Sequence, residues 1–177
     1  HIFEYGYDSL NRVESIRYGE KDINGNYTAS EKFKYSYTPT GELGITKDFV
    51  NNRTIKYEYD LAQRIAKISG SNGYITKFSY DKNNNLFSLT ETVDGNPRSS
   101  YYYYDADNRP TLSSFGSTYD SRYEYDGLGR IARELTSHVI HPYYPSIKVM
   151  DYTYKPGVNG SKTTRVATTN DGHDLYA

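Results

Sequence analysis

Carboxylates recur at regular places along this 177-residue chain, and they are the groups best suited to acid–base chemistry. The five that share one local context are Asp8, Asp60, Asp81, Asp105 and Asp126. Hydrolysis of a glycosidic bond needs two carboxyl groups, roughly 5 to 10 Å apart, flanking the bond. Each of these aspartates directly follows a tyrosine, where its carboxylate can accept hydrogen bonds from backbone N–H groups two residues on. We therefore interpret them as turn formers and predict a protein that is not an enzyme and needs no cofactor.

Two other residue types suggest ligand sites. His138 and His141 are three residues apart, but they lie beside prolines, and no cysteine or carboxylate completes a metal set nearby, so we predict no metal site. Four arginines at a fixed place after the aspartate could bind anions as a stripe. Their fixed place favours structural contacts instead, with a tyrosine ring or with the aspartate of a nearby repeat. They are Arg12, Arg64, Arg109 and Arg130.

These residues belong to a short repeat that reads aromatic, any residue, tyrosine, then usually aspartate. The second tyrosines are 30, 22, 21, 24, 21 and 29 residues apart. Such a short period predicts an array of small units rather than one conventional core, so we treat residues 1–177 as one repeat segment. The units are centred on Tyr7, Tyr37, Tyr59, Tyr80, Tyr104, Tyr125 and Tyr154.

Each unit has the properties of a β-hairpin. Two tyrosines in a Tyr-x-Tyr strand leave the same face. Glycine or asparagine three residues after the aspartate, as at Asn11 or Gly129, suits a positive φ in a turn closed by a bulge. Arginine and an aliphatic residue then begin the return strand, whose aliphatic side chains, such as Ile65 and Ile68, should interleave with the tyrosines. Each hairpin contains about 20 residues. Seven such hairpins give roughly 14 strands, so the sequence predicts an all-β protein.

The composition favours a single layer. Tyrosine supplies 22 residues, whereas only 36% of the chain is hydrophobic, so a thick two-layer core is not expected. We predict one curved, open antiparallel sheet with a tyrosine-rich face. The two longest spacings predict loops, a long turn over Glu20 to Ser30 and an irregular segment over Thr136 to Ile147 that contains Pro142 and Pro145.

The segment Tyr123-Glu-Tyr-Asp-Gly-Leu-Gly-Arg-Ile131 resembles the YD repeat of the Rhs, teneurin and insecticidal-toxin-complex family, as does Tyr57-Glu-Tyr-Asp-Leu-Ala-Gln-Arg-Ile65. The resemblance covers nearly the whole chain. It implies that the hairpins add edge to edge into a spiralling sheet, part of a shell around a toxin or other cargo in a large secreted or surface protein, here of a bacterium. Some family members cleave themselves at an Asp-Pro-x-Gly-Leu stretch. This sequence has no Asp-Pro, so that chemistry is not carried over.

The repeat residues that we expect to be structural occupy the same few places in each unit. They are Tyr5, Tyr7, Asp8, Arg12, Tyr57, Tyr59, Asp60, Arg64, Tyr80, Asp81, Tyr102, Tyr104, Asp105, Arg109, Tyr123, Tyr125, Asp126, Gly129 and Arg130.

Two functions fit this pattern. The first is a structural segment of a shell that encloses or presents a cargo domain, with neighbouring repeats as its partners. The alternative is a cell-surface adhesion module that binds glycans or a partner protein through exposed tyrosine and arginine, with Tyr102 and Tyr123 as candidate ligand-binding residues. Packing is the simpler explanation of the tyrosines, since tyrosine combines a large apolar ring with a hydroxyl that tolerates water.

The bulk properties limit the partners further. The net charge is −1 and there is no basic block, which argues against nucleic acid. No apolar run is long enough for membrane insertion. The chain starts mid-pattern at His1 without a signal peptide, so we expect a fragment of a longer array. Because a cut sheet has unpaired edges, we also expect self-association through the sheet edges or the tyrosine face.

Overall fold

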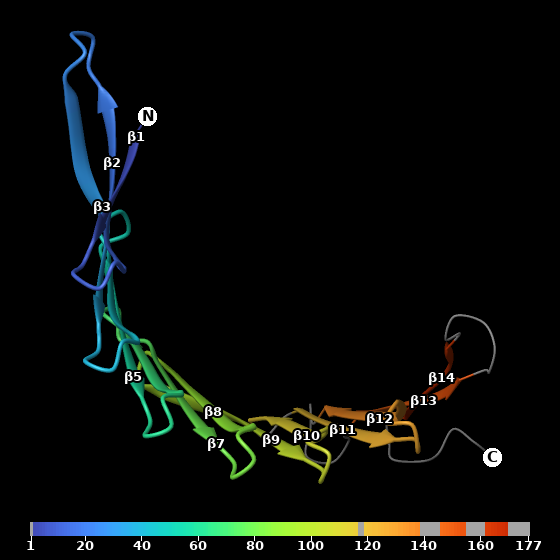
Figure 1. Cartoon of the computed structure of the whole chain (residues 1–177). Coiled ribbons are helices and arrows are strands. Elements are labelled where there is room, and N and C mark those ends of the chain that lie inside the picture. The colour runs from blue at the N-terminus through green and yellow to red at the C-terminus, as the bar shows by residue number, and fades with distance from the viewer. Residues whose placement is uncertain (1, 117–118, 139–145, 155–161, 170–177) are drawn as a thin grey trace. The chain divides into compact units, whose positions relative to one another are not determined.

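The computed structural model describes residues 2–116, 119–138, 146–154 and 162–169, and all of its regular structure there is β-strand (Figure 1). The strands are β1 (Ile2–Tyr7), β2 (Val13–Lys21), β3 (Tyr27–Tyr37), β4 (Leu43–Asp48), β5 (Arg53–Tyr59), β6 (Ile65–Gly70), β7 (Ile75–Tyr80), β8 (Leu86–Val93), β9 (Asn96–Tyr104), β10 (Pro110–Phe115), β11 (Tyr119–Tyr125), β12 (Ile131–His138), β13 (Ser146–Tyr154) and β14 (Lys162–Thr169). No helix in these ranges is long and apolar enough to cross a membrane.

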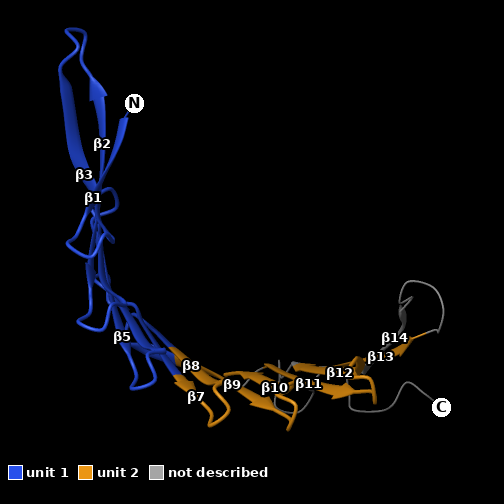
Figure 2. Cartoon of the chain, viewed as in Figure 1, with its two compact units in different colours: residues 1–78, 91–97 blue, residues 79–90, 98–177 orange. Residues whose placement is uncertain are grey.

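The strand order follows the chain order in one open sheet. Strands β1 to β7 pair successively and antiparallel, and so do β9 to β14. The chain divides into two compact units, one of residues 1–78 and 91–97 and one of residues 79–90 and 98–177 (Figure 2). The predicted all-β, antiparallel open sheet is confirmed, whereas its spiral course and the grouping of residues 1–177 as one segment stay predictions.

The turn after each second tyrosine, here called the motif turn, has one backbone geometry in all six described copies. In the third copy the Asp60 N–H donates to the Arg64 carbonyl at 2.8 Å and the Gln63 N–H donates to the Asp60 carbonyl at 3.0 Å. The residue before the arginine position has positive φ each time. These residues are Asn11 (60°), Gly41 (106°), Gln63 (61°), Asn84 (73°), Asn108 (59°) and Gly129 (76°).

A β-bulge accompanies the motif turn. In β5 and β6, Tyr59 lies opposite Ile65 but Glu58 lies opposite Lys67, so the return strand contains one extra residue, Ala66. The same shift occurs beside Tyr7, Tyr37 and Tyr125. A bulge increases the local twist and changes the direction in which side chains point. It therefore fixes the orientation of the second tyrosine relative to the turn.

Tyrosines and aliphatic residues share one face of the sheet. Tyr57 lies opposite Ile68 and Tyr59 opposite Ile65, and residues that lie opposite each other in an antiparallel pair point to the same side. Both tyrosines are half-buried, whereas Glu58 between them is exposed and forms a 2.7 Å ion pair with Lys67. The expected interleaving therefore occurs.

The described strands form a single sheet without a second layer among the described residues, so few side chains are fully buried. Within the described residues no large side chain is completely enclosed, and the buried polar side chains are the small Thr76 and Ser113, 4% and 8% exposed. Apolar burial alone is therefore a modest source of stability here, and contacts along the sheet become correspondingly important.

The structure corrects one of the two predicted loops and shortens the other. Residues Glu20–Ser30 form the end of a hairpin rather than a long turn, since Glu20 pairs with Thr28 and only the five residues from Asp22 to Asn26 turn. The insertion lengthens β2 and β3 because Asp22 and Gly25, with φ 82°, build a tight turn like the motif turns. At the second place β12 reaches His138 and β13 starts at Ser146, while Pro142 and Pro145 lie outside the described residues.

The left-handed backbone of Gln63 generates a first prediction. This conformation costs a non-glycine residue roughly 1–2 kcal/mol, partly offset by the greater entropy of unfolded glycine. Gln63→Gly should therefore raise the free energy of unfolding by about 0.5–1 kcal/mol in urea denaturation. The matched control is Leu61→Gly, in the same turn at a fully exposed residue outside the positive-φ set, which should lower it. A loss of stability in Gln63→Gly would contradict the strain argument.

Candidate functional site

The aspartate of a motif turn organises the turn and then binds the arginine of the same turn. Asp60 accepts hydrogen bonds at Oδ1 from the backbone N–H groups of Ala62 at 2.9 Å and Arg64 at 3.0 Å. Its Oδ2 accepts from Nε of Arg64 at 2.8 Å and lies 2.7 Å from Nη2. The same pairs form in three further turns, Asp8–Arg12, Asp105–Arg109 and Asp126–Arg130.

These contacts keep the carboxylates ionised. The pKa of Asp60, Asp105 and Asp126 is lowered, first by hydrogen bonds from the arginine side chain and next by the arginine backbone N–H. A carboxylate held in this way is a poor proton donor near neutral pH. The arrangement therefore supports the interpretation of these aspartates as turn formers.

The arginine contacts the aspartate of its own repeat, and the expected contact with an aspartate of a nearby repeat is not what the structure shows. The guanidinium lies over the second tyrosine of the following repeat. The distance from the guanidinium carbon to the ring centre is 4.1 Å for Arg12 over Tyr37, 4.6 Å for Arg109 over Tyr125 and 4.0 Å for Arg130 over Tyr154. Such cation–π contacts contribute about 0.5–1 kcal/mol at exposed sites.

The same tyrosine hydroxyl reaches back to the preceding repeat. Tyr125 donates to the carbonyl of Pro110 at 2.6 Å, and Tyr104 donates to the carbonyl of Leu86 at 3.1 Å. Burial raises the pKa of Tyr125, with the charge of Asp105 adding to the effect, so its hydroxyl stays a donor. Three further copies follow the pattern, Tyr37 to Val13, Tyr59 to Leu43 and Tyr154 to Ile131.

We call this set of contacts the repeat junction: aspartate and arginine of one turn, the second tyrosine of the next repeat, and the carbonyl to which it donates. The arginine also borders the positive-φ residue of the next turn. Nη1 of Arg12 lies 3.5 Å from the Gly41 carbonyl oxygen, and a Cβ built on Gly129 would lie 3.3 Å from Nη1 of Arg109. Glycine at 129 therefore serves both the backbone conformation and the approach of the arginine.

Two repeats depart from this chemistry. In the fourth, Asn85 replaces arginine, and its amide donates to Oδ2 of Asp81 at 3.1 Å and to Oδ1 of Asn108 in the next turn at 2.9 Å. In the second, Thr38 replaces aspartate and Glu42 replaces arginine. There the acceptor and donor exchange places, since Oε2 of Glu42 accepts from the hydroxyl of Thr38.

The candidate ligand-binding residues Tyr102 and Tyr123 are half-buried on the shared tyrosine face. Tyr102 packs edge-on against Phe115 with ring centres 6.1 Å apart. Near Tyr102, a cluster of more exposed rings lies on the opposite face. They are Phe87, Tyr101 and Tyr103, which are 37%, 40% and 45% exposed, and Phe87 contacts Tyr101 and Tyr103 at 6.1 and 5.7 Å between ring centres. Strand alternation within the run Tyr101-Tyr-Tyr-Tyr104 is the signal that could have located them.

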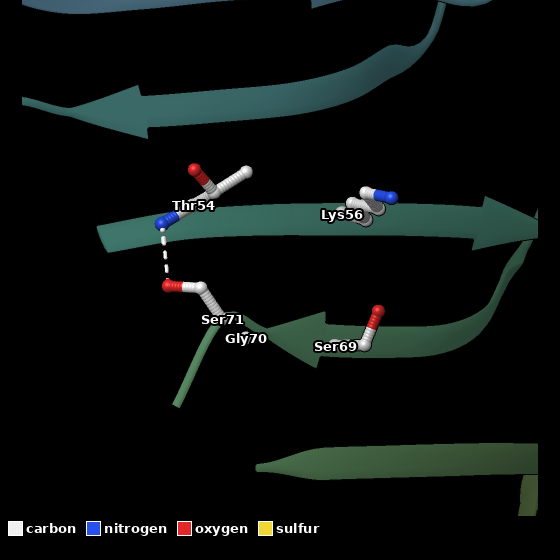
Figure 3. A pocket seen from close by; sticks show the side chains of 5 residues that line it. All are labelled: Thr54, Lys56, Ser69, Gly70 and Ser71. Atoms are coloured by element: carbon white, nitrogen blue, oxygen red, sulfur yellow. Dashed lines mark hydrogen bonds between the residues drawn. The ribbon is translucent and has the colours of Figure 1, made fainter. Parts of the chain in front are cut away.

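Two other candidate sites were a metal site and a depression on the sheet. In the part of the chain that the structure describes, no cluster of three His, Cys, Asp or Glu residues could hold a metal ion. His141 and the side chain of His138 lie outside that part. A depression on β5 and β6 is lined by Thr54, Lys56, Ser69, Gly70 and Ser71, where the Thr54 N–H donates to the Ser71 hydroxyl at 3.0 Å (Figure 3). It contains one amine and no carboxylate partner.

Comparison with known proteins yields structural matches only. No protein-family model matches the chain, and neither does any curated protein. The crystal structure of TcdB2-TccC3-Cdc42 matches 96% of this chain at 14% identity with a TM-score of 0.50, and that of TcdB2-TccC3 matches 93% at 14% identity with a TM-score of 0.49. The match spans 11% and 12% of those chains. The first of these likenesses shows a shared fold and nothing more specific.

The junction hydroxyl generates a second prediction. Tyr125→Phe keeps the ring under Arg109 but removes the hydrogen bond to Pro110, so the free energy of unfolding should fall by about 0.5–1.5 kcal/mol. Tyr123→Phe is the control, because its hydroxyl has no hydrogen-bond partner in the described residues, and stability should change little. Chemical denaturation of both variants measures the difference. Equal effects of the two substitutions would rule out a specific role for the Tyr125 hydroxyl.

Proposed function

We propose that this chain is a non-enzymatic structural segment of a larger YD-repeat protein, where it forms part of the wall of a β-sheet shell. The observation that carries this proposal is the repeat junction. The recurring aspartate, arginine and tyrosine bind one another between successive hairpins, so the residues that the sequence repeats serve to join one hairpin to the next. An enzyme or a receptor would instead direct such groups toward a ligand.

The shared fold supports the proposal at a coarser level. Nearly all of the chain matches the TcdB2-TccC3-Cdc42 structure although it spans only 11% of that chain, as a segment of a long array should. Enclosure or presentation of a cargo domain, and a secreted or surface location in a bacterium, follow from the motif resemblance and are part of the proposal.

The edge of β1 supports neighbouring repeats as partners. Tyr5 and Tyr7 on β1 are 54% and 55% exposed, whereas Tyr57 and Tyr59 are half-buried. A further hairpin paired with β1 would cover these rings and place an arginine over Tyr7, as Arg12 lies over Tyr37. We therefore propose that the β1 edge pairs with another hairpin of the same type, from the parent protein or from a second copy.

Electron microscopy of the full-length parent protein tests the shell. The expected result is a closed wall with a cavity, in which a labelled C-terminal domain lies inside or at an opening. Rod-like particles without a cavity, or a C-terminal domain that lies apart from the sheet, would exclude enclosure.

Adhesion is the second candidate, and the exposed rings of Phe87, Tyr101 and Tyr103 favour it, because aromatic faces can stack on sugar rings. A glycan array with the purified chain discriminates. If adhesion operates, saturable binding should drop at least about tenfold in a Tyr101→Ala, Tyr103→Ala variant, a loss of about 1.4 kcal/mol. Tyr102→Ala with Tyr123→Ala tests the face that the sequence indicated. An array without saturable binding would leave the structural proposal and eliminate glycan adhesion.

A further inference from the structure

The second repeat places a carboxylate where four other repeats have a guanidinium. Glu42 stands five residues after the second tyrosine of its repeat, the position of Arg12 in the first repeat. Arg12 lies over Tyr37, with its guanidinium carbon 4.1 Å from the ring centre. The next repeat after Glu42 still offers the equivalent ring, Tyr59. The junction between these two repeats therefore has the tyrosine but a side chain of opposite charge.

An open depression lies at this junction. Its lining includes Glu42 from one repeat and Tyr59 and Gln63 from the next. These three positions correspond to Arg12, Tyr37 and Gly41 one junction earlier, where Nη1 of Arg12 also lies 3.5 Å from the Gly41 carbonyl oxygen. The depression thus lies beside the same ring and backbone groups that contact a guanidinium elsewhere in the sheet.

The charge of the depression is negative. Oε2 of Glu42 accepts from the hydroxyls of Thr38 and Thr40, and these hydrogen bonds hold the pKa of Glu42 below its usual value. Within the described residues no lysine or arginine side chain forms an ion pair with Glu42. The other lining carboxylates, Glu58 and Asp60, are paired with Lys67 and Arg64, and no lysine or arginine lines the depression.

We propose that this junction binds an arginine side chain of another polypeptide. Its guanidinium would lie on the Tyr59 ring and donate to Oε1 of Glu42 and to the backbone carbonyl of Gln63, which reproduces in trans the contacts that Arg12 makes in cis. The planar guanidinium suits this site better than an ammonium group, because it stacks on a ring while it donates in its own plane. The proposal goes beyond the structural role and does not depend on a shell.

NMR titration of the isotope-labelled chain with Nα-acetyl-arginine amide tests the site. We expect saturable shifts of the Glu42, Tyr59 and Gln63 amides with a dissociation constant on the order of tens of millimolar, as an exposed ion pair and one cation–π contact allow. The neutral analogue Nα-acetyl-citrulline amide should bind at least about fivefold more weakly. No saturable shift, or equal binding of the citrulline probe, would overturn the proposal.

Two variants locate the binding. Glu42→Gln should weaken the arginine probe about fivefold, while Glu14→Gln, an exposed glutamate on β2, should leave it unchanged. The double variant Thr38→Asp, Glu42→Arg restores the aspartate–arginine turn and supplies its own guanidinium over Tyr59. It should abolish probe binding and raise the melting temperature, and it keeps the test decisive if Glu42→Gln fails to fold. Unchanged probe binding in the double variant would refute the site.

Discussion

The structure depends on contacts that run along the sheet, because the described strands form one sheet and no second layer among the described residues covers either face. A sandwich gains most of its stability by burying apolar side chains between two sheets. Here no large side chain in the described residues is fully enclosed. The repeat junction takes over part of that role, since it ties aspartate, arginine, tyrosine and a backbone carbonyl of successive hairpins together. Each of these contacts contributes little free energy alone. Because they recur at successive hairpins, their sum contributes to the stability of the whole array.

The junction works only because the motif turn presents its arginine in one orientation. The aspartate accepts two backbone N–H groups, and the positive φ of the fourth turn residue brings the arginine back toward the carboxylate. The planar guanidinium of the arginine then makes two contacts. Its edge donates to the aspartate, and its face lies on the ring of the next tyrosine. The Thr38–Glu42 turn shows that the backbone geometry survives without either residue, so the turn and the junction are separable. The backbone of the hairpins can therefore stay the same where the side chains at a junction change.

Much of the fold was predictable from local patterns. The spacing of the second tyrosines located the hairpins, and Asn11 and Gly129 marked positive φ because few residues tolerate it. Gln63 adopts the same positive-φ conformation although glutamine does not predict it. The hydrogen bonds of the neighbouring Asp60 and Arg64 impose this conformation. The polar residues from Glu20 to Ser30 predict a long turn, and this prediction is wrong because Asp22 and Gly25 build a tight turn that lets both strands continue.

The amino-acid sequence by itself determined the strands, the turns and the face on which the tyrosines lie, because these depend on residues close together in the chain. Only the tertiary structure decided which partners the long side chains select. Arg12 and Tyr37 are 25 residues apart, and their contact exists because the sheet sets successive hairpins side by side. The negative depression beside Glu42 likewise follows from neighbours that pairing across the sheet brings together.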